Sequence, residues 1–470
     1  MNEKVIEADY FKESILFFKH HQWLYDAPVN TLLSREVLDK FPVEWLQALR
    51  NLDNDRLNEF VVKKSVQLDW PASLIDFVEK CQKLNRLPSV AFPLSIKLPK
   101  EFTRNLTKKK QHEIFYFSKL VHEQCLSKQI NTIIDLGAGL GYICQLLNHL
   151  YHYKVLGLES RLENIKAAET RQVKYFPESI SSVKYVCYTV ASNSASEIDR
   201  ILQNYFSQGE NVCLIGLHAC GDLSINMAKI YLEMEIAKCL ILVSCCYHKM
   251  STKESTACTE NIGETTKLIE EKEYFNFFPV SAALKDALNI SDLDEGTYFK
   301  RSFLRLACQE TSDRWLDMDA ETHDKHSFCV LARGVLELFC AMNQLTLKKV
   351  VRKGTRRSQC TTFINYLEDC KLRYTFESQT DEEKNRDILS TLWDDDLMNN
   401  LVTLWESNQD KQNTIELYTA LQLLLQNVAE SLVLLDRLKF LKEEGLDSEI
   451  FQIADRSISP RSNAIVSWKR

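Results

Sequence analysis

The stretch Thr132-Ile-Ile-Asp-Leu-Gly-Ala-Gly-Leu-Gly-Tyr142 decides the fold, because a β-branched run passes through closely spaced glycines into a helical pattern. Its first residues are typical of a buried parallel strand. Apolar residues follow the glycines at helical spacing: Cys144, Leu146, Leu147 and Leu150. Glycine permits positive φ and lets a ligand approach the backbone, and the first N–H groups of the next helix are free to bind it. The stretch therefore predicts a strand, turn and helix that bind a nucleotide-like cofactor.

The end of this loop distinguishes between cofactors. A dinucleotide fingerprint asks for Gly or Ala at the position of Tyr142, so nicotinamide binding loses support. The pattern Asp135-x-Gly137-x-Gly139-x-Gly141 instead resembles the first motif of class I S-adenosylmethionine-dependent methyltransferases, in which the loop faces the methionine end of the cofactor. The resemblance implies cofactor-binding roles for Asp135, Gly137, Ala138, Gly139, Gly141 and Tyr142.

A second feature agrees with the glycine loop. The segment Lys154-Val-Leu-Gly-Leu-Glu159 reads as a strand that ends in an acid, 22 residues after Gly137, near the interval expected for a ribose-binding carboxylate. In the methyltransferases that the loop resembles, an acid at this place holds the ribose hydroxyls, which implies that role for Glu159. The alternative is that the glycines form only a tight turn and Glu159 is a solvated strand end. The agreement of strand, helix and spaced acid favours the cofactor site.

Strand and helix patterns alternate from about residue 130 to 247, which predicts an α/β fold with a doubly wound, Rossmann-like parallel sheet. The five expected strands are Thr132–Asp135, Lys154–Leu158, Val183–Val190, Val212–Leu217 and Cys239–Ser244. A chain of 470 residues is long enough for two or three domains. We expect an N-terminal helical region (1–104), the first part of a methyltransferase core (105–249), a largely helical insertion or lid (250–425), and the last helix and two strands of the core (426–470).

Polar side chains and cysteines follow the fourth and fifth expected strands, in His218-Ala-Cys220-Gly221-Asp222 and Ser244-Cys245-Cys246-Tyr247-His248. Ligands of doubly wound sheets bind beyond the carboxyl ends of the strands. We predict His218 and His248 as proton acceptors and Asp222 and Tyr247 as substrate-orienting groups.

The same segments contain side chains that could bind a metal ion. Cys220, Cys245, Cys246 and His248 are chemically suitable zinc ligands. Adjacent cysteines do not give the usual two-residue spacing between ligand pairs, so no metal site is predicted. The alternative for all these residues is that they are packed strand-end side chains.

Five segments together resemble the methyltransferase-like protein 25 family, and the resemblance extends from about residue 90 onward. They are the Asp135 glycine loop, the two segments that follow the fourth and fifth strands, Lys108-Lys-Lys110-Gln-His112-Glu113 and Ser459-Pro460-Arg461. That family includes a branch named for a ribosomal RNA adenine dimethylase domain. The His-x-Cys-Gly and Cys-Cys-x-His segments also resemble the eukaryotic tRNA 2′-O-methyltransferases, which implies RNA as the acceptor. The Asn/Asp-Pro-Pro-Tyr/Phe segment of base-amino methyltransferases is missing after the fourth strand, so the pattern does not support adenine dimethylation.

The net charge of −7 excludes a basic nucleic-acid coat, so RNA must bind to local patches. One candidate is Lys108–Lys110, and the other, Lys348–Arg357, contains Lys348, Lys349, Arg352, Lys353, Arg356 and Arg357. Charge runs of this kind are more often solvated faces than binding sites. A protein acceptor or partner is the alternative, and a catalytically inactive interaction scaffold is a third possibility.

Cellular location is predicted from cysteine usage and from the absence of targeting patterns. Fifteen cysteines, an odd number without the spacing of a secreted disulfide scaffold, indicate a reducing compartment. The N-terminal residues resemble neither a signal peptide nor a transit peptide. The apolar stretch Ile415–Leu438 contains too many polar residues to span a bilayer. We expect a cytoplasmic or nuclear protein that does not bind membranes.

Overall fold

The computed structural model describes residues 3–93, 98–104, 106–207, 209–253, 272–351, 361–378 and 393–469, with side chains from residue 9 onward. The chain forms two compact units. Unit 1 contains Met1–His20, Lys83–Thr311 and Gln426–Arg470, and unit 2 contains His21–Gln82 and Ser312–Leu425. Of the predicted domain boundaries, the one at 425 coincides with a boundary between units, whereas those at 104 and 249 fall inside unit 1.

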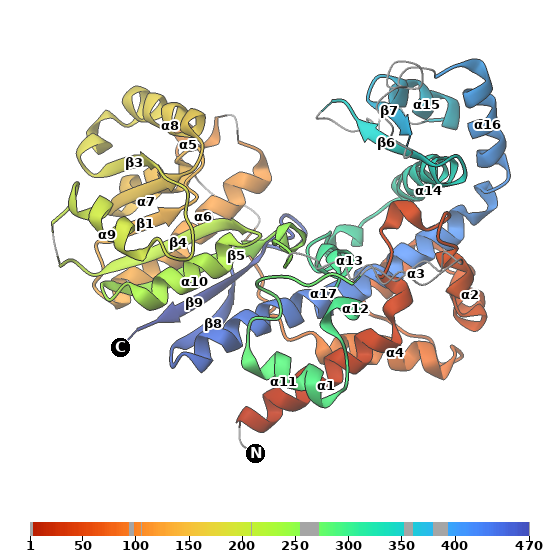
Figure 1. Ribbon diagram of the computed structural model, residues 1–470, viewed down its shortest axis with the longest axis horizontal. Helices are drawn as coiled ribbons and strands as arrows, with labels where there is room; N and C mark the ends of the chain where they lie inside the picture. The colour runs from red at the N-terminus through yellow and green to blue at the C-terminus, as the bar shows by residue number, and fades with distance from the viewer. Residues whose placement is uncertain are drawn as a thin grey trace, which may run out of the picture. The chain divides into compact units, whose positions relative to one another are not determined.

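A seven-stranded sheet with the order β3-β2-β1-β4-β5-β9-β8 forms the centre of unit 1 (Figure 1). Strands β1 to β5 are parallel to one another: β1 (Thr132–Leu136), β2 (Lys154–Glu159), β3 (Val183–Cys187), β4 (Val212–Cys220) and β5 (Ala237–Cys245). The last two are antiparallel to their neighbours: β8 (Asp447–Gln452) and β9 (Asn463–Trp468). The predicted α/β fold with a mostly parallel sheet is confirmed.

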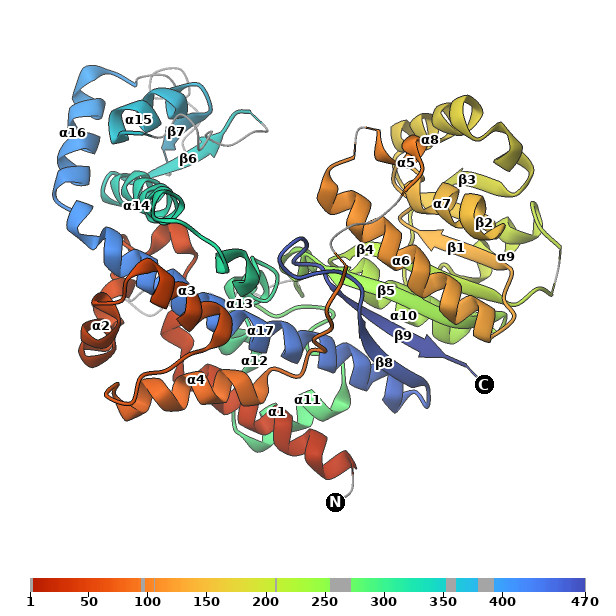
Figure 2. The ribbon, with the colours of Figure 1, turned by 180° about the vertical axis from the view of Figure 1, so that it is seen from behind.

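Helices cover both faces of this sheet: α6 (Lys108–Ser127), α7 (Tyr142–Tyr151), α8 (Leu162–Tyr175), α9 (Ala195–Gln203) and α10 (Leu223–Glu233). Figures 1 and 2 show α10 and α6 on opposite faces of the strands. All five residues of β1 are buried, as expected for a strand whose β-branched run is covered on both sides. The sheet therefore provides a rigid base for the loops at its strand ends.

Other helices of unit 1 lie outside the sheet layers: α1 (Glu3–His20), α5 (Lys100–Thr103), α11 (Ala282–Ile290), α12 (Glu295–Tyr298) and α13 (Arg301–Leu306). The rings of Phe18 in α1 and Phe303 in α13 pack edge to face with centroids 4.9 Å apart. The part of the chain from 272 to 311 thus packs with the sheet unit, although the sequence places it within the insertion.

Unit 2 is mainly helical: α2 (Val43–Arg50), α3 (Asn54–Lys63), α14 (Ala320–Met342), α15 (Phe363–Lys371), α16 (Asp395–Glu406) and most of α4 (Ala72–Leu84). A two-stranded antiparallel sheet, β6 (Leu345–Lys349) and β7 (Tyr374–Ser378), accompanies them. Short 3₁₀ turns complete the two units: Gln22–Leu24, Val29–Thr31, Val37–Lys40, Pro177–Ser181, Tyr247–Lys249, Ser312–Trp315 and Gln409–Lys411.

Helix α17 (Gln412–Glu443) contributes its first residues to unit 2 and its last to unit 1. By length and composition the segment Gln409–Glu443 could cross a membrane, but its most apolar window is entirely buried inside the protein. Full burial of an apolar helix is typical of a core helix. The apolar composition of α17 is therefore explained by packing within this fold.

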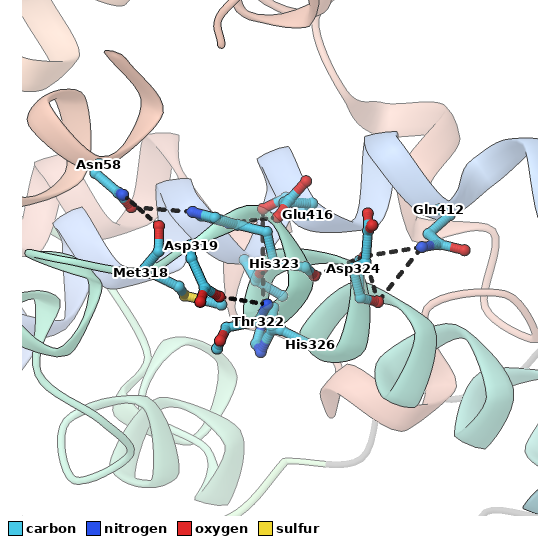
Figure 3. Close-up of polar contacts among 11 residues, drawn as sticks. Asn58, Met318, Asp319, Thr322, His323, Asp324, His326, Gln412 and Glu416 are labelled. Atoms are coloured by element: carbon cyan, nitrogen blue, oxygen red, sulfur yellow. Dashed lines mark hydrogen bonds and ion pairs between the residues drawn. The ribbon is translucent and has the colours of Figure 1, made fainter. Parts of the chain in front are cut away.

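A buried polar network fixes α17 to its neighbours within unit 2 (Figure 3). The His323 ring in α14 lies with Nδ1 2.7 Å from Glu416 Oε1 of α17 and with Nε2 3.0 Å from Asn58 Oδ1 of α3. Asn58 also donates to the Met318 carbonyl at 2.8 Å. Buried polar groups are stable only when they are paired, so this network specifies how three helices pack. We assign it a structural role.

Candidate functional site

The loop between β1 and α7 contains three glycines with positive φ, but they serve different purposes. Gly137, Gly139 and Gly141 have φ of +94°, +56° and +70°. A Cβ on Gly141 would lie 2.3 Å from the Tyr185 hydroxyl, so this glycine is required by packing. A Cβ on Gly139 would meet no atom of the described residues within 4 Å. The backbone at Gly139 is therefore the part of the loop that a ligand can approach.

Glu159 lies at the edge of this open space. The residue ends β2 and is 9% exposed, and its Oε2 accepts a hydrogen bond from the Gly139 N–H at 3.0 Å. Its Oε1 accepts from the Arg161 N–H, also at 3.0 Å. The loop is tied to the same strand because the Ala138 N–H donates to the Leu158 carbonyl at 3.0 Å. The structure thus brings the glycine loop and the predicted ribose-binding acid together.

Asp135 is a buried residue of β1 that lies next to the glycine loop. It is 3% exposed, and its Oδ2 accepts a hydrogen bond from the Cys144 thiol at 3.3 Å. Burial raises the pKa of Asp135 to about 7, and the hydrogen bond from Cys144 opposes that rise. Tyr142 turns toward α8, where the Arg171 guanidinium lies 3.8 Å from its ring centroid. These two predicted cofactor residues make contacts within the protein that hold the loop and the start of α7 in place.

An irregularity in β4 exposes His218 near the carboxyl end of that strand. The strand is longer than predicted, and its register with β5 shifts between Gly216 and Ala219, so that Leu217 and His218 form a β-bulge. Bulges re-aim side chains and are common next to active sites. The His218 side chain is 46% exposed, although it belongs to an inner strand.

Glu113 of α6 holds the His218 ring. Its side chain is 2% exposed, and its Oε2 lies 3.4 Å from His218 Nε2. Its Oε1 accepts a hydrogen bond from the Ser459 hydroxyl at 2.5 Å and lies 3.8 Å from Lys109 Nζ. Burial raises the pKa of Glu113, but its hydrogen bonds with His218 and Ser459 and the charge of Lys109 outweigh burial and keep that pKa below its usual value. A buried, ionised carboxylate therefore faces the exposed imidazole.

The role of Glu113 was not assigned from the sequence. The residue lies in the Lys108–Glu113 motif, four positions after Lys109, which predicts only a local helical ion pair. Its partner His218 comes from a distant strand, and the bulge that turns His218 toward α6 has no pattern in the sequence.

Two of the other predicted catalytic residues are engaged within the protein. Tyr247 is 1% exposed, and its hydroxyl lies 3.5 Å from Glu430 Oε1 of α17. The Tyr247 hydroxyl is thus engaged within the protein, and its substrate-orienting role stays a prediction. Asp222 accepts a hydrogen bond from the Ser251 N–H at 3.0 Å, which ties the segment after β5 to the start of α10.

His248 is half-buried, with Nδ1 3.1 Å from the Cys308 sulfur. Burial lowers the pKa of His248, and the charges of Arg305, Lys249 and Arg461 lower it further. Of the two predicted proton acceptors, His218 has the more exposed ring.

Three cysteine sulfurs also meet at this end of the sheet. Cys220 and Cys245 are register partners at the ends of β4 and β5, and their sulfurs lie 3.0 Å apart. Cys246 follows with φ of +45°. The sulfur atoms of all three cysteines lie within 4.8 Å of one another.

The comparisons with known proteins agree with this architecture. Residues 109–253 match the family model of a methyltransferase domain. The probable methyltransferase-like protein 25 of Mus musculus is 24% identical over 280 residues, 58% of this chain and 40% of its own length. The Homo sapiens protein of the same name is 25% identical over 274 residues, 58% of this chain and 39% of its own length. The match thus spans about two fifths of these curated relatives.

Among solved structures, the SAH-bound Podospora anserina methyltransferase PaMTH1 is 14% identical, covering 38% of this chain and 72% of its own, with a TM-score of 0.24. A score this low does not establish a common fold. The methyltransferase domain match includes the glycine loop, Glu113, Glu159 and His218, whereas Ser459 lies outside it. The relatives support the resemblance to the methyltransferase-like protein 25 family, while the ribosomal RNA adenine dimethylase branch stays a prediction.

Proposed function

We propose that this chain is an S-adenosylmethionine-dependent methyltransferase that acts on RNA. The observation that carries the cofactor assignment is the open backbone at Gly139 beside the Glu159 carboxylate, within a matched methyltransferase domain. These residues fit the cofactor, because Glu159 can accept hydrogen bonds from ribose hydroxyls and Gly139 leaves room for the methionine end. When bound, S-adenosylmethionine supplies a methyl group that is already activated as a sulfonium.

The protein's own task is then to position the acceptor and remove its proton. The ionised Glu113 accepts a hydrogen bond from His218 Nε2–H, which leaves Nδ1 with the lone pair that can take a proton. Because Glu113 is also held by Ser459, its carboxylate cannot easily turn away from the ring. His218 is thus the proton acceptor in this proposal, and Glu113 is its positioning residue.

Exposed cations favour a polyanionic acceptor. Lys108, Lys109 and Lys110 are exposed in the first turn of α6, one turn before Glu113. Phosphate contacts of this kind position a nucleic acid without reading its sequence. The second predicted patch carries less weight, because Lys348 is paired with Glu377 at 2.8 Å and residues 352–357 lie outside the described part of the chain.

The cofactor assignment is tested by calorimetric titration of the full chain with S-adenosylmethionine and with NAD. We expect binding of S-adenosylmethionine alone, with a dissociation constant on the order of micromolar. Glu159→Ala should weaken it by more than about tenfold, and Gly139→Arg should abolish it. Glu163→Ala, an exposed acid in the first turn of α8, is the matched control and should bind as the wild type does. Binding of NAD instead would overturn the assignment.

The acceptor is tested with cofactor labelled in the methyl group and total cellular extract. RNA as acceptor requires label that is removed by nuclease and resists protease. The double variant Lys108→Glu and Lys110→Glu should incorporate less label, whereas Lys119→Glu, exposed later on the same helix, should not. Label removed by protease alone would favour a protein acceptor. Cofactor binding without any transfer would favour the scaffold.

A further inference from the structure

We propose that Cys220, Cys245 and Cys246 form a binding site for a single thiophilic metal ion, with zinc as the best match. Their sulfur atoms lie within 4.8 Å of one another. In a tetrahedral zinc site, Zn–S bonds of about 2.3 Å separate the sulfurs by about 3.8 Å. The three thiols are therefore grouped at a spacing suited to one ion, and the adjustment needed at the Cys220 and Cys245 pair, now 3.0 Å apart, is about 0.8 Å.

The backbone explains how two adjacent cysteines can both be ligands. Successive side chains of a strand point to opposite faces, so two adjacent cysteines within a strand would not reach the same ion. Here β5 ends at Cys245, and Cys246 adopts the left-handed conformation with φ of +45° and ψ of 48°. This turn brings the Cys246 sulfur into the group. Non-glycine residues held in this region are strained, and such strain clusters at functional sites.

The two segments that carry the cysteines are fixed to each other. Gly221, directly after Cys220, has φ of +55°, and a Cβ on it would lie 2.8 Å from the Lys249 carbonyl oxygen. Asp222 Oδ1 accepts a hydrogen bond from the Ser251 N–H at 3.0 Å. The turn after β4 therefore packs closely against the turn after β5, and the sulfur atoms are brought together by the protein itself. Such pre-organisation is what a metal site requires.

The surroundings suit a thiolate-bound cation with one open coordination position. Cys245 is buried, whereas Cys220 and Cys246 are half-buried. Within the described part of the chain, no His, Cys, Asp or Glu ligand atom joins the three sulfurs as a fourth member. Zinc sites with three protein ligands keep a position for water or a substrate atom. The positive charges of Arg461 and Lys249 act on Cys246 and are of the sign that zinc with three thiolates requires.

The test is metal analysis of the full chain, purified under reducing conditions. We expect about one zinc ion per chain, and replacement by Co²⁺ should give the sulfur-to-cobalt charge-transfer and visible bands of a tetrahedral thiolate site. Cys220→Ser and Cys246→Ser should each lower metal affinity by more than about tenfold. Cys187→Ser, at the exposed end of β3, is the matched control and should retain the metal. Circular dichroism establishes that each variant is folded.

Several outcomes would overturn the site. The proposal is wrong if the wild-type protein contains no zinc and takes up neither Zn²⁺ nor Co²⁺. It is also wrong if both serine variants retain the metal. A disulfide between Cys220 and Cys245, found by mass spectrometry of alkylated protein, would show that these thiols form a redox pair instead. If Cys220→Ser fails to fold, the half-buried Cys246→Ser decides the result. None of these readouts needs methyl transfer, so the metal site and the proposed function fail separately.

Discussion

Glu113 shows how one buried side chain can set the chemistry of an exposed one. Its carboxylate is held by Ser459 and faces the His218 ring, which the β4 bulge presents to solvent. Glu113→Gln keeps the size of the side chain but removes its charge. We expect kcat to fall by about 10- to 100-fold with cofactor affinity unchanged. The measurement is methyl-transfer kinetics beside calorimetry, with Glu123→Gln, exposed on the same helix, as the control. Equal kcat values would remove Glu113 from the mechanism.

Two glycines of one loop allow a matched comparison. Gly141→Ala places a methyl group 2.3 Å from the Tyr185 hydroxyl at a positive φ, and should lower the free energy of unfolding by about 2–3 kcal/mol. Gly139→Ala meets no neighbour among the described residues and should cost only about 1 kcal/mol, from its positive φ, while weakening cofactor binding. Urea unfolding and calorimetry measure the two effects. Similar stability losses in both variants would contradict the assignment of distinct roles.

At the scale of elements, much of unit 1 could be predicted from the sequence. The β-branched run, glycine loop and helical pattern around Asp135 correspond to β1 and α7, and the two strands expected within residues 426–470 correspond to β8 and β9. Such elements are local, because periodicity and turn residues determine them. The Glu113–His218 pair and the cysteine cluster depend instead on strand register, a bulge and a left-handed residue, which single-sequence patterns do not encode.

Helix α17 also anchors a segment that the sequence assigns to an insertion. Asp436 is fully buried and accepts hydrogen bonds from the N–H groups of Val280 and Ser281, at 2.8 and 2.9 Å, and from the Ser281 hydroxyl. Asp436→Ala leaves these donors unsatisfied and should lower the free energy of unfolding by about 3 kcal/mol. Glu444→Ala, exposed beyond the end of the helix, should change it by less than about 0.5 kcal/mol. Chemical denaturation compares the two, and equal stabilities would contradict the anchoring role.

For the whole molecule, buried acids determine how stability depends on pH. Burial raises the pKa of Asp135 and of Glu430 to about 7, so between about pH 4 and pH 7 the folded state binds more protons than the unfolded state. The free energy of unfolding should therefore fall as pH rises through this window and level off above it. Glu113, whose pKa is lowered, acts in the opposite sense but only at more acidic pH.

Asp135→Asn tests this pH dependence. The variant removes one of the buried ionisations, so the loss of stability between about pH 5 and pH 7.5 should be smaller by on the order of 2 kcal/mol. The measurement is denaturant unfolding across that pH range, with Asp199→Asn, half-exposed on α9, as the control. A slope identical to that of the wild type would show that Asp135 is not protonated in the folded state.

The division into two units could not be predicted, because each unit is built from segments that are far apart in the chain. Neither the 21–82 segment nor the 312–425 segment has a composition that marks it as the partner of the other. Contacts such as the buried network of His323, Glu416 and Asn58 define unit 2, and they appear only once the chain is folded.

The position of β9 has a consequence for synthesis on the ribosome. Strand β5 ends at Cys245, but the strand that pairs with its outer edge ends at Trp468, about 220 residues later. At translation rates of about 5–20 residues per second, the backbone groups along this edge of β5 stay unpaired for roughly 10 to 45 s, until β9 has been synthesised. An unpaired apolar edge is a template for wrong pairing with other chains. The nascent protein therefore passes through an interval in which chaperones have a natural target, before the last segment closes the sheet.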